Sequence, residues 1–253
     1  MSKKLYSMLR PKMMPHMLCR GCGHGIVINA VLRAILDLEI PLTECVLVSA
    51  AGCMSLATSP HIALDMLHGL RGLAVPCATG IKRANPALRV IVIGGEGDLV
   101  SLQTTHLVHA ARKNIDITVI CANNHICASN GGAASSTTPV GAITATTPKG
   151  NTQMPLDICK LLIGAGASYV ARYSVAQPKA LTRAIKVAIV GKNFAFVEAL
   201  TMCPTEYGKR NNILEPVDMI KNLKISCMPG DISLGASRKG ISDRIVIGEY
   251  GRK

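Results

Sequence analysis

The chain has no tryptophan, only two phenylalanines, and few acidic residues, with 15 aspartates and glutamates against 28 lysines and arginines. Aromatic residues make up 3% of its 253 residues and hydrophobic residues 49%, so we expect an aliphatic core. Proteins that bind nucleic acid usually cluster their basic residues and add aromatic rings that stack on bases. Here the basic residues are scattered. The net charge of +13 therefore favours an acidic protein or an anionic substrate over nucleic acid.

Long apolar runs are also missing. The longest uncharged stretch, residues 45–64, contains Ser, Thr, Gly, Pro and His, which argues against a membrane span. The Met-rich start has no apolar signal-peptide core. Its basic residues, with no acid before Asp37, resemble a transit peptide, but the cysteine motif at Cys19 begins too early to be discarded. Ten cysteines without a secretion signal predict a reducing compartment, the cytoplasm, and metal or cluster ligation instead of disulfides.

A strand, a helix and a second strand are predicted in the middle of the chain. Residues 89–93 and 115–122 are β-branched runs typical of buried strands, and residues 99–112 carry apolar side chains at helical spacing. This pattern predicts an α/β protein with a doubly wound, mostly parallel sheet. We expect one domain, with its core at about 17–211 and a C-terminal extension at 212–253.

An acid and an amide follow these two strands. Glu96 stands in Gly95-Glu96-Gly97-Asp98 after the first strand, and Asn124 follows the second strand 28 positions later. Glycines let the backbone approach a phosphate closely. Magnesium usually binds one or two protein oxygens together with phosphate oxygens. The spacing predicts a magnesium ion that holds a diphosphate, as in a thiamine diphosphate site; the alternative is two ordinary turns.

The cysteines fall into two groups. Cys19 and Cys22 form a CxxC pair before a helix expected at residues 26–38. A redox pair is disfavoured because no strand precedes it, a zinc knuckle would lack its second ligand pair, and an iron–sulfur cluster would need two more thiolates. Cys53 and Cys203 each follow a predicted strand and could supply them; the spacing leaves these alternatives open. Three others lie among apolar residues and are expected to be packed thiols: Cys45, Cys121 and Cys159.

Ordered motifs run through residues 17–211. They are Cys-Arg-Gly-Cys-Gly-His-Gly at 19–25, Ala-Gly-Cys at 51–53, Ala-Thr-Gly-Ile-Lys at 78–82, Gly-Glu-Gly-Asp at 95–98, Asn-Asn at 123–124, Ser-Thr-Thr-Pro at 136–139 and Cys-Pro-Thr-Glu-Tyr-Gly-Lys-Arg-Asn at 203–211. By these motifs the chain resembles the β subunit of 2-oxoacid:ferredoxin oxidoreductases, most closely the 2-oxoglutarate branch. The resemblance implies a fold of the thiamine diphosphate-binding type.

The resemblance also implies a set of site residues. The ligands of a 4Fe–4S cluster would be Cys19, Cys22, Cys53 and Cys203. The magnesium ligands would be Glu96, Asn124 and the carbonyl of Ile126. The thiamine diphosphate contacts would be Ala51, Gly52, Cys53, Met54, His68, Gly95, Gly97, Asp98, Ala128 and Ser129. His68 would lie on the substrate side of the cofactor, and we assign a catalytic role to His68 and Arg71.

Three positions depart from the family pattern. Glu96 stands where the family usually has Asp, Met54 where it usually has Ser, and Arg71-Gly72-Leu73 where it usually has His-Gly-Arg. The last change moves a guanidinium group, and Arg is the usual partner of a carboxylate. We expect it to bear on the choice of 2-oxoacid more than on the chemistry.

The implied function is CoA-dependent oxidative decarboxylation of a 2-oxoacid, with 2-oxoglutarate favoured, to an acyl-CoA and carbon dioxide. Electrons would pass through the cluster to an acidic ferredoxin. An α subunit would supply the glutamate that activates the cofactor, in an assembly such as (αβ)2. The alternatives are pyruvate or a branched-chain 2-oxoacid as substrate, or a non-catalytic electron-transfer or scaffold subunit. In the extension we expect a helix at 214–224, an edge strand at 244–248 and a reserve ligand, Cys227.

Overall fold

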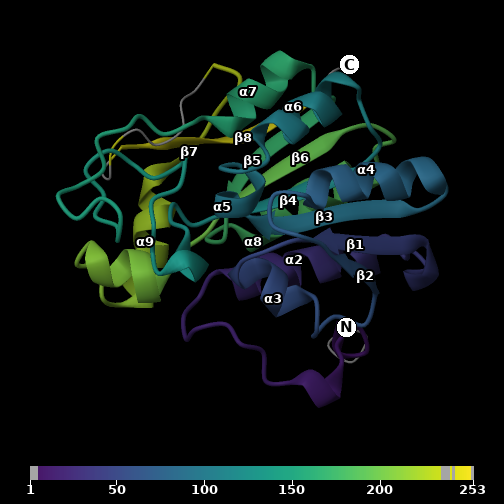
Figure 1. The fold of residues 1–253 in the computed structure, drawn as a ribbon, viewed down its shortest axis with the longest axis horizontal. Helices are drawn as coiled ribbons and strands as arrows, with labels where there is room; N and C mark the ends of the chain where they lie inside the picture. The colour runs from purple at the N-terminus through teal and green to yellow at the C-terminus, as the bar shows by residue number, and fades with distance from the viewer. Residues whose placement is uncertain (1–4, 235–239, 241–242, 252–253) are drawn as a thin grey trace.

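A computed structural model of the protein describes residues 5–234, 240 and 243–251. Within them the strands form one sheet in the order β2-β1-β3-β4-β6-β5-β8-β7 (Figure 1). The strands are β1 (Cys45–Ser49), β2 (Asp65–His68), β3 (Arg89–Gly95), β4 (Thr118–Asn123), β5 (Tyr169–Ser174), β6 (Ala195–Leu200), β7 (Cys227–Pro229) and β8 (Ile245–Gly251). Neighbouring strands are parallel except β5 and β8. The predicted mostly parallel α/β sheet is confirmed.

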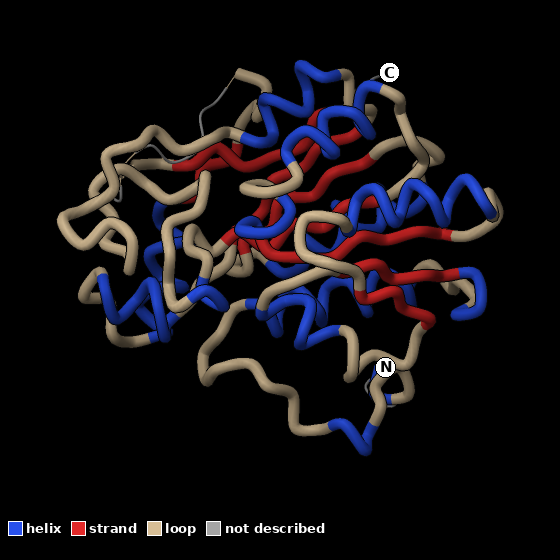
Figure 2. Tube along the Cα trace, viewed as in Figure 1, coloured by secondary structure: helices blue, strands red, loops and turns tan. Residues whose placement is uncertain are grey.

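Helices cover both faces of the sheet (Figure 2). One face carries α2 (His24–Asp37) and α8 (Pro178–Val190), and the other carries α4 (Ala74–Ala84), α6 (Thr104–Arg112) and α7 (Ile158–Ala165). The other helical segments are α3 (Cys53–Thr58), α5 (Glu96–Leu99), α9 (Pro216–Ser226), η1 (Pro11–Met13), η2 (Leu42–Glu44), η3 (Ala128–Asn130) and the π-helical turn η4 (Pro204–Gly208). No helix among these described elements has the length and apolar character that crossing a membrane requires.

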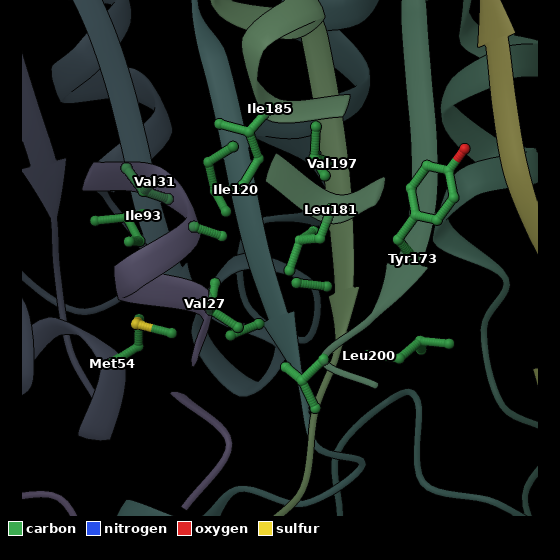
Figure 3. Close-up of a cluster of buried hydrophobic side chains, with 14 of the residues drawn as sticks. Val27, Val31, Met54, Ile93, Ile120, Tyr173, Leu181, Ile185, Val197 and Leu200 are labelled. Atoms are coloured by element: carbon green, nitrogen blue, oxygen red, sulfur yellow. The ribbon is translucent and has the colours of Figure 1, made fainter. Parts of the chain in front are cut away.

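The aliphatic composition explains how the layers pack. Figure 3 shows Val27 and Val31 of α2 and Ile185 of α8 against Ile120 of β4 and Val197 of β6. Successive strand residues point to opposite faces. A strand with helices on both sides therefore favours apolar residues on both faces, which is why β3 and β4 contain runs of β-branched residues.

The helix expected at residues 99–112 is broken in two. Helix α5 already begins at Glu96, and α6 begins only at Thr104. Between them the side chain of Gln103, fully buried, accepts a hydrogen bond from the Val75 amide at 2.9 Å and donates one to Asp98 at 3.0 Å. These bonds hold a turn that helical periodicity alone does not reveal.

The C-terminal strand differs from its predicted position. β8 is not at the edge of the sheet, because β7 pairs outside it and β5 pairs on its other side. Glu249 of β8 accepts hydrogen bonds from the hydroxyls of Tyr169 and Tyr173 and from Arg183, which explains its inner position. The expected helix at 214–224 is present as α9.

The parallel strands bring their carboxyl ends to one edge of the sheet. Gly95 at the end of β3 is level with Ala122 in β4, and Asn123 at the end of β4 is level with Leu200 in β6. The segments that follow β1, β3, β4 and β6 therefore meet at this edge, where open α/β sheets bind ligands.

Candidate active site

A pocket of about 380 Å³ lies at this edge, between the segments that follow β1, β3 and β4. It is lined by His24, Ala51, Gly52, Cys53, Met54, Arg71, Gly95, Glu96, Gly97, Asp98, Asn124, Ile126, Cys127, Ala128 and Ser129. The structure thus brings together every residue assigned from the sequence to magnesium, and every one assigned to thiamine diphosphate except His68. We call this the cofactor pocket.

The carboxylate of Glu96 is the most unusual group in the cofactor pocket. Glu96 is only 2% exposed, and its Oε1 has no hydrogen-bond partner. Burial raises the pKa of Glu96 to about 7, although the backbone N–H groups of Glu96, Asn124 and Ile126 and the Ser135 hydroxyl lower it in part. A buried carboxylate with one unpaired oxygen is costly unless a cation approaches it.

The loop after β4 presents oxygens near this carboxylate. Asn124 is 5% exposed, and His125 adopts a left-handed φ of 63°. The side-chain oxygen of Asn124 accepts the Ile126 amide at 3.2 Å, and the Ile126 carbonyl accepts the Ala128 amide at 2.9 Å. Each of these oxygens keeps a second lone pair. One carboxylate, one amide and one carbonyl form an all-oxygen set that suits magnesium.

Gly97 has no room for a side chain. A Cβ at this position would lie 2.3 Å from the sulfur of Cys127. The segments after β3 and β4 therefore touch at Gly97, and only glycine permits this approach.

Asp98 links the pocket to the segment after β2. Its carboxylate accepts the Gly72 amide at 2.7 Å and the Gln103 side chain at 3.0 Å. The neighbouring Arg71 lines the pocket and donates a hydrogen bond to the side chain of Asn130 at 2.8 Å. His68 is exposed at the end of β2, with its Nδ1 3.5 Å from the Ser49 hydroxyl, and does not line the pocket. Its assigned role stays a prediction.

A second pocket, of about 610 Å³, adjoins the first and is lined by four cysteines from three distant segments. Cys19 and Cys22 precede α2, Cys53 begins α3, and Cys203 follows β6. We call this the cysteine pocket. The two pockets share His24, Cys53, Asn124 and Ala128.

Backbone groups around these sulfurs suit thiolates. The amide of His24 faces the sulfur of Cys22, and the amide of Glu206 donates to that of Cys203 at 3.4 Å. Burial, with a smaller contribution from nearby Cys203, Cys53 and Cys19, raises the pKa of Cys22 to about 11, although the His24 amide lowers it in part. A bound metal reverses this tendency, because ligation removes the thiol proton.

The CxxC segment is fastened to the segment after β6. The Gly23 amide donates to the carbonyl of Met202 at 3.2 Å, and a Cβ on Gly23 would lie 2.2 Å from the hydroxyl oxygen of Thr201. This close approach brings Cys22 and Cys203 into the same pocket. Sequence spacing could not specify it.

Other histidine and cysteine positions complete the description. Among residues that the structure describes, no three His, Cys, Asp or Glu side chains lie close enough to share a single metal ion. Cys45, Cys121 and Cys159 are buried, as expected for packed thiols, Cys127 lines the cofactor pocket, and Cys227 lies in β7, away from the cysteine pocket.

His24 is a site residue that the sequence analysis did not single out for the cofactor. It lines both pockets, is 2% exposed, and its Nδ1 has no hydrogen-bond partner. Burial lowers its pKa to about 4, so the ring is neutral at physiological pH. Its place beside the CxxC pair was the available signal.

Comparison with known protein families identifies the class of domain to which the chain belongs. Residues 45–199 match the family of thiamine pyrophosphate enzymes, C-terminal TPP binding domain. The segments that line the cofactor pocket after β1, β3 and β4 fall within this match. The chain is therefore a member of that domain family.

Comparison with individual proteins shows more narrowly which family of proteins the chain belongs to. The chain is 42% identical to 2-oxoglutarate synthase subunit KorB of Methanocaldococcus jannaschii, over 96% of this chain and 89% of the relative. It is 38% identical to the KorB subunit of Methanothermobacter marburgensis, over 96% and 85% of the two chains. A solved 2-oxoglutarate:ferredoxin oxidoreductase from Magnetococcus marinus, with 2-oxoglutarate, coenzyme A and succinyl-CoA bound, matches with a TM-score of 0.84 and 29% identity, over 99% of this chain and 85% of that one. The chain belongs to the β subunits of the 2-oxoacid:ferredoxin oxidoreductases, in the 2-oxoglutarate synthase branch.

The close approach of Gly97 to Cys127 leads to a testable prediction. Gly97→Ala should lower the free energy of unfolding by about 1–3 kcal/mol, because the added methyl group overlaps the sulfur of Cys127. Urea unfolding of the purified chain measures this. Gly164→Ala in α7 is the matched control, since its Cβ would meet nothing within 4 Å, and it should be neutral or stabilising. Adding Cys127→Ala to Gly97→Ala should restore most of the lost stability; no recovery would contradict the proposed overlap.

Proposed function

We propose that the chain is the β subunit of a thiamine diphosphate-dependent 2-oxoacid:ferredoxin oxidoreductase that converts 2-oxoglutarate and coenzyme A to succinyl-CoA and carbon dioxide. The observation that carries the proposal is the buried Glu96 carboxylate, which has an unpaired oxygen and lines a glycine-rich pocket together with Asn124 and Ile126. The names of the relatives support the substrate, because KorB is a subunit of 2-oxoglutarate synthase.

The oxygen set fits a magnesium ion. Glu96, the side chain of Asn124 and the carbonyl of Ile126 would hold it, and the ion would neutralise the diphosphate of the cofactor. Glu96 is one methylene longer than the usual Asp. Glu96 is the first residue of α5, and three backbone N–H groups face its carboxylate, which would help to place the longer side chain at the ion.

Thiamine diphosphate supplies the electron sink that decarboxylation of a 2-oxoacid requires. The chain's own contribution is to bind and orient it. The backbone at Gly95 and Gly97 allows close approach of the diphosphate. Met54 stands where the family usually has a hydroxyl, and its side chain is buried in the hydrophobic core. Arg71 is a cationic side chain that lines the pocket, and it would bind a carboxylate of the substrate. Its hydrogen bond to Asn130 holds it there.

The cysteine pocket fits a 4Fe–4S cluster. Cys19, Cys22, Cys53 and Cys203 would be its ligands, and the amides of His24 and Glu206 would donate to the ligand sulfurs. The cluster would lie next to the cofactor, because the two pockets share four residues. Electrons released at the cofactor would then have a short path to the protein surface, where Cys19 is exposed.

The proposal requires two partners. The described residues contain one cofactor-binding half, so the glutamate that activates the aminopyrimidine would come from an α subunit, in an assembly such as (αβ)2. An acidic ferredoxin would accept the electrons, and the net charge of +13 would favour its approach. Free cysteines fit the reducing conditions of the cytoplasm.

Replacing the buried acid tests the metal site. The folded-state pKa of Glu96, about 7, lies above its unfolded value, so the carboxylate destabilises the metal-free protein as the pH rises through 7. Glu96→Gln should therefore raise the free energy of unfolding by about 1–3 kcal/mol at pH 8, and by much less at pH 5. Urea unfolding of the metal-free chain at the two pH values measures the difference, and an equal effect at both would contradict the proposed burial of a charge.

The Glu96→Gln variant should also bind thiamine diphosphate weakly. In the assembled enzyme, Glu96→Gln should weaken magnesium-dependent thiamine diphosphate binding by about 100-fold or more, since even outer-shell partners of a metal contribute 10–100-fold. Isothermal titration calorimetry measures this affinity. Undiminished binding would remove Glu96 from the site, and a wild-type assembly that binds no cofactor would favour the non-catalytic scaffold alternative.

Iron analysis tests the cysteine pocket. Anaerobically purified wild-type protein should contain about four iron and four labile sulfide atoms per chain. Cys203→Ser should lose most of this iron, because one of the four thiolates is removed. Cys45→Ala is the control, since Cys45 is buried in the core and lines neither pocket. Equal iron contents in the two variants would rule out the assignment.

Substrate assays test the reaction. The chain, coproduced with its α subunit and assayed anaerobically with coenzyme A, should reduce a viologen dye with a higher kcat/KM for 2-oxoglutarate than for pyruvate or 3-methyl-2-oxobutanoate. The chain alone should not turn over, because it lacks the activating glutamate. Robust activity of the isolated polypeptide would overturn the two-subunit proposal, and a preference for another 2-oxoacid would overturn the substrate assignment.

A further inference from the structure

A buried ion pair lies beside the cofactor pocket, and the chemistry proposed above makes no use of it. Arg172 of β5 is fully buried and Glu198 of β6 is 2% exposed, and the Arg172 Nε is 2.5 Å from Glu198 Oε2. The two residues face each other across neighbouring strands. Arg172 also binds Asp157, which caps the N-terminus of α7, at 2.6 Å. A buried charge pair is costly to desolvate, so its retention calls for a role.

The second oxygen of Glu198 reaches the next strand. Its Oε1 accepts a hydrogen bond from the side-chain NH₂ group of Asn123 at 2.7 Å. Burial alone would raise the pKa of Glu198, but Arg172 and Asn123 hold it below its usual range. The group facing Asn123 is therefore a carboxylate, which only accepts hydrogen bonds. This fixes the orientation of the Asn123 amide, with its nitrogen toward Glu198.

The oxygen of Asn123 consequently points toward the loop that contains the proposed metal ligands. It accepts the backbone amide of His125 at 3.0 Å and the hydroxyl of Thr137 at 2.9 Å. The carbonyl of His125 accepts the Thr138 hydroxyl at 2.8 Å. His125 has the left-handed φ of 63°, a conformation that is uncommon for non-glycine residues.

The bend at His125 lies between two of the proposed magnesium ligands. Asn124 precedes it and Ile126 follows it, so the left-handed residue decides how the Asn124 side chain and the Ile126 carbonyl are aimed. Asn123 itself does not line the cofactor pocket. Its contacts run from the ion pair to the bend, which places it behind the site and outside the space for substrate and cofactor.

We propose that Asn123 is a positioning residue, anchored on the buried Arg172–Glu198 pair, that holds the Asn124–Ile126 loop in the shape required for binding magnesium and the cofactor diphosphate. This inference rests on the proposed thiamine diphosphate site. It gives the ion pair a function: the fixed carboxylate of Glu198 sets the orientation of one amide, and that amide sets a bend in the backbone.

Exchanging the amide and the carboxylate of the Asn123–Glu198 hydrogen bond tests the proposal. Asn123→Asp places a carboxylate against Glu198, and Glu198→Gln places a second amide between Asn123 and Arg172, so each single variant leaves one contact mismatched. Each should raise the magnesium concentration for half-maximal thiamine diphosphate binding by roughly tenfold or more, the range found for outer-shell partners. In the double variant the new amide at position 198 can donate to the new carboxylate at position 123 while its oxygen still faces Arg172. The double variant should bind close to wild type.

The measurement uses the complete chain assembled with its α subunit, titrated with magnesium at fixed thiamine diphosphate in a calorimeter, together with the Tm of each assembly. Thr118→Val is the matched control. It removes an equally buried hydroxyl at the opposite end of β4, where Thr118 donates to the Ala188 carbonyl at 3.0 Å. The control should lower the Tm without changing the magnesium requirement.

A milder variant covers the case in which a charged substitution prevents assembly. Thr137→Val removes one of the hydrogen bonds to the Asn123 oxygen, together with the contact between the Thr137 and Ser135 hydroxyls, and should raise the magnesium requirement by a smaller factor than Asn123→Asp. Variants at 123, 137 and 198 that lower the Tm as Thr118→Val does but leave the magnesium requirement unchanged would show a merely structural role and overturn the inference. Failure of the double variant to recover would do the same. A wild-type assembly that binds no thiamine diphosphate would instead overturn the proposed function.

Discussion

The arrangement of the candidate active site depends on one unpaired oxygen of a buried carboxylate. Glu96 is held at the end of β3, shielded from water, with Oε1 unpaired. A protein gains nothing in stability from such a group, because burying a charge without a partner costs free energy. The cost is understandable if the missing partner is a cation. The glycines around Glu96 and the carbonyl and amide oxygens after β4 surround it in the manner of a diphosphate-bound magnesium site.

The parallel sheet makes this arrangement possible. Four strands end at the same edge, and the chain continues from each of them into a segment that carries part of the site. The cofactor pocket and the cysteine pocket are adjacent because the segment after β1 contributes to both, with Cys53 at the start of α3. Decarboxylation and electron removal would therefore occur in neighbouring spaces, which suits an enzyme that must pass on electrons as soon as they are released.

The polar groups behind the site are also connected to one another by hydrogen bonds. Arg172, Glu198 and Asn123 lie on β5, β6 and β4 and form a continuous chain of hydrogen bonds across the sheet. β8 adds to this frame, because Glu249 ties together Tyr169, Tyr173 and Arg183 beside it. The C-terminal extension is thus part of the sheet, as the predicted strand at 244–248 indicated, but at an inner position instead of the edge.

The sequence by itself determined the βαβ unit, the acid and amide at two strand ends and the division of the cysteines, because each depends on local periodicity or on glycine at a turn. It also carried the family resemblance, through motifs spread over most of the chain. It did not reveal the break at Gln103, the inner position of β8, or the placement of His24 between two pockets. These depend on contacts between residues far apart in the chain: a buried side chain that bonds to another turn, two tyrosines that hold a strand, and a glycine that lets the CxxC segment touch the end of β6. Only the tertiary structure decided them, because hydrogen bonds and close packing across the sheet leave no periodic signal in the sequence.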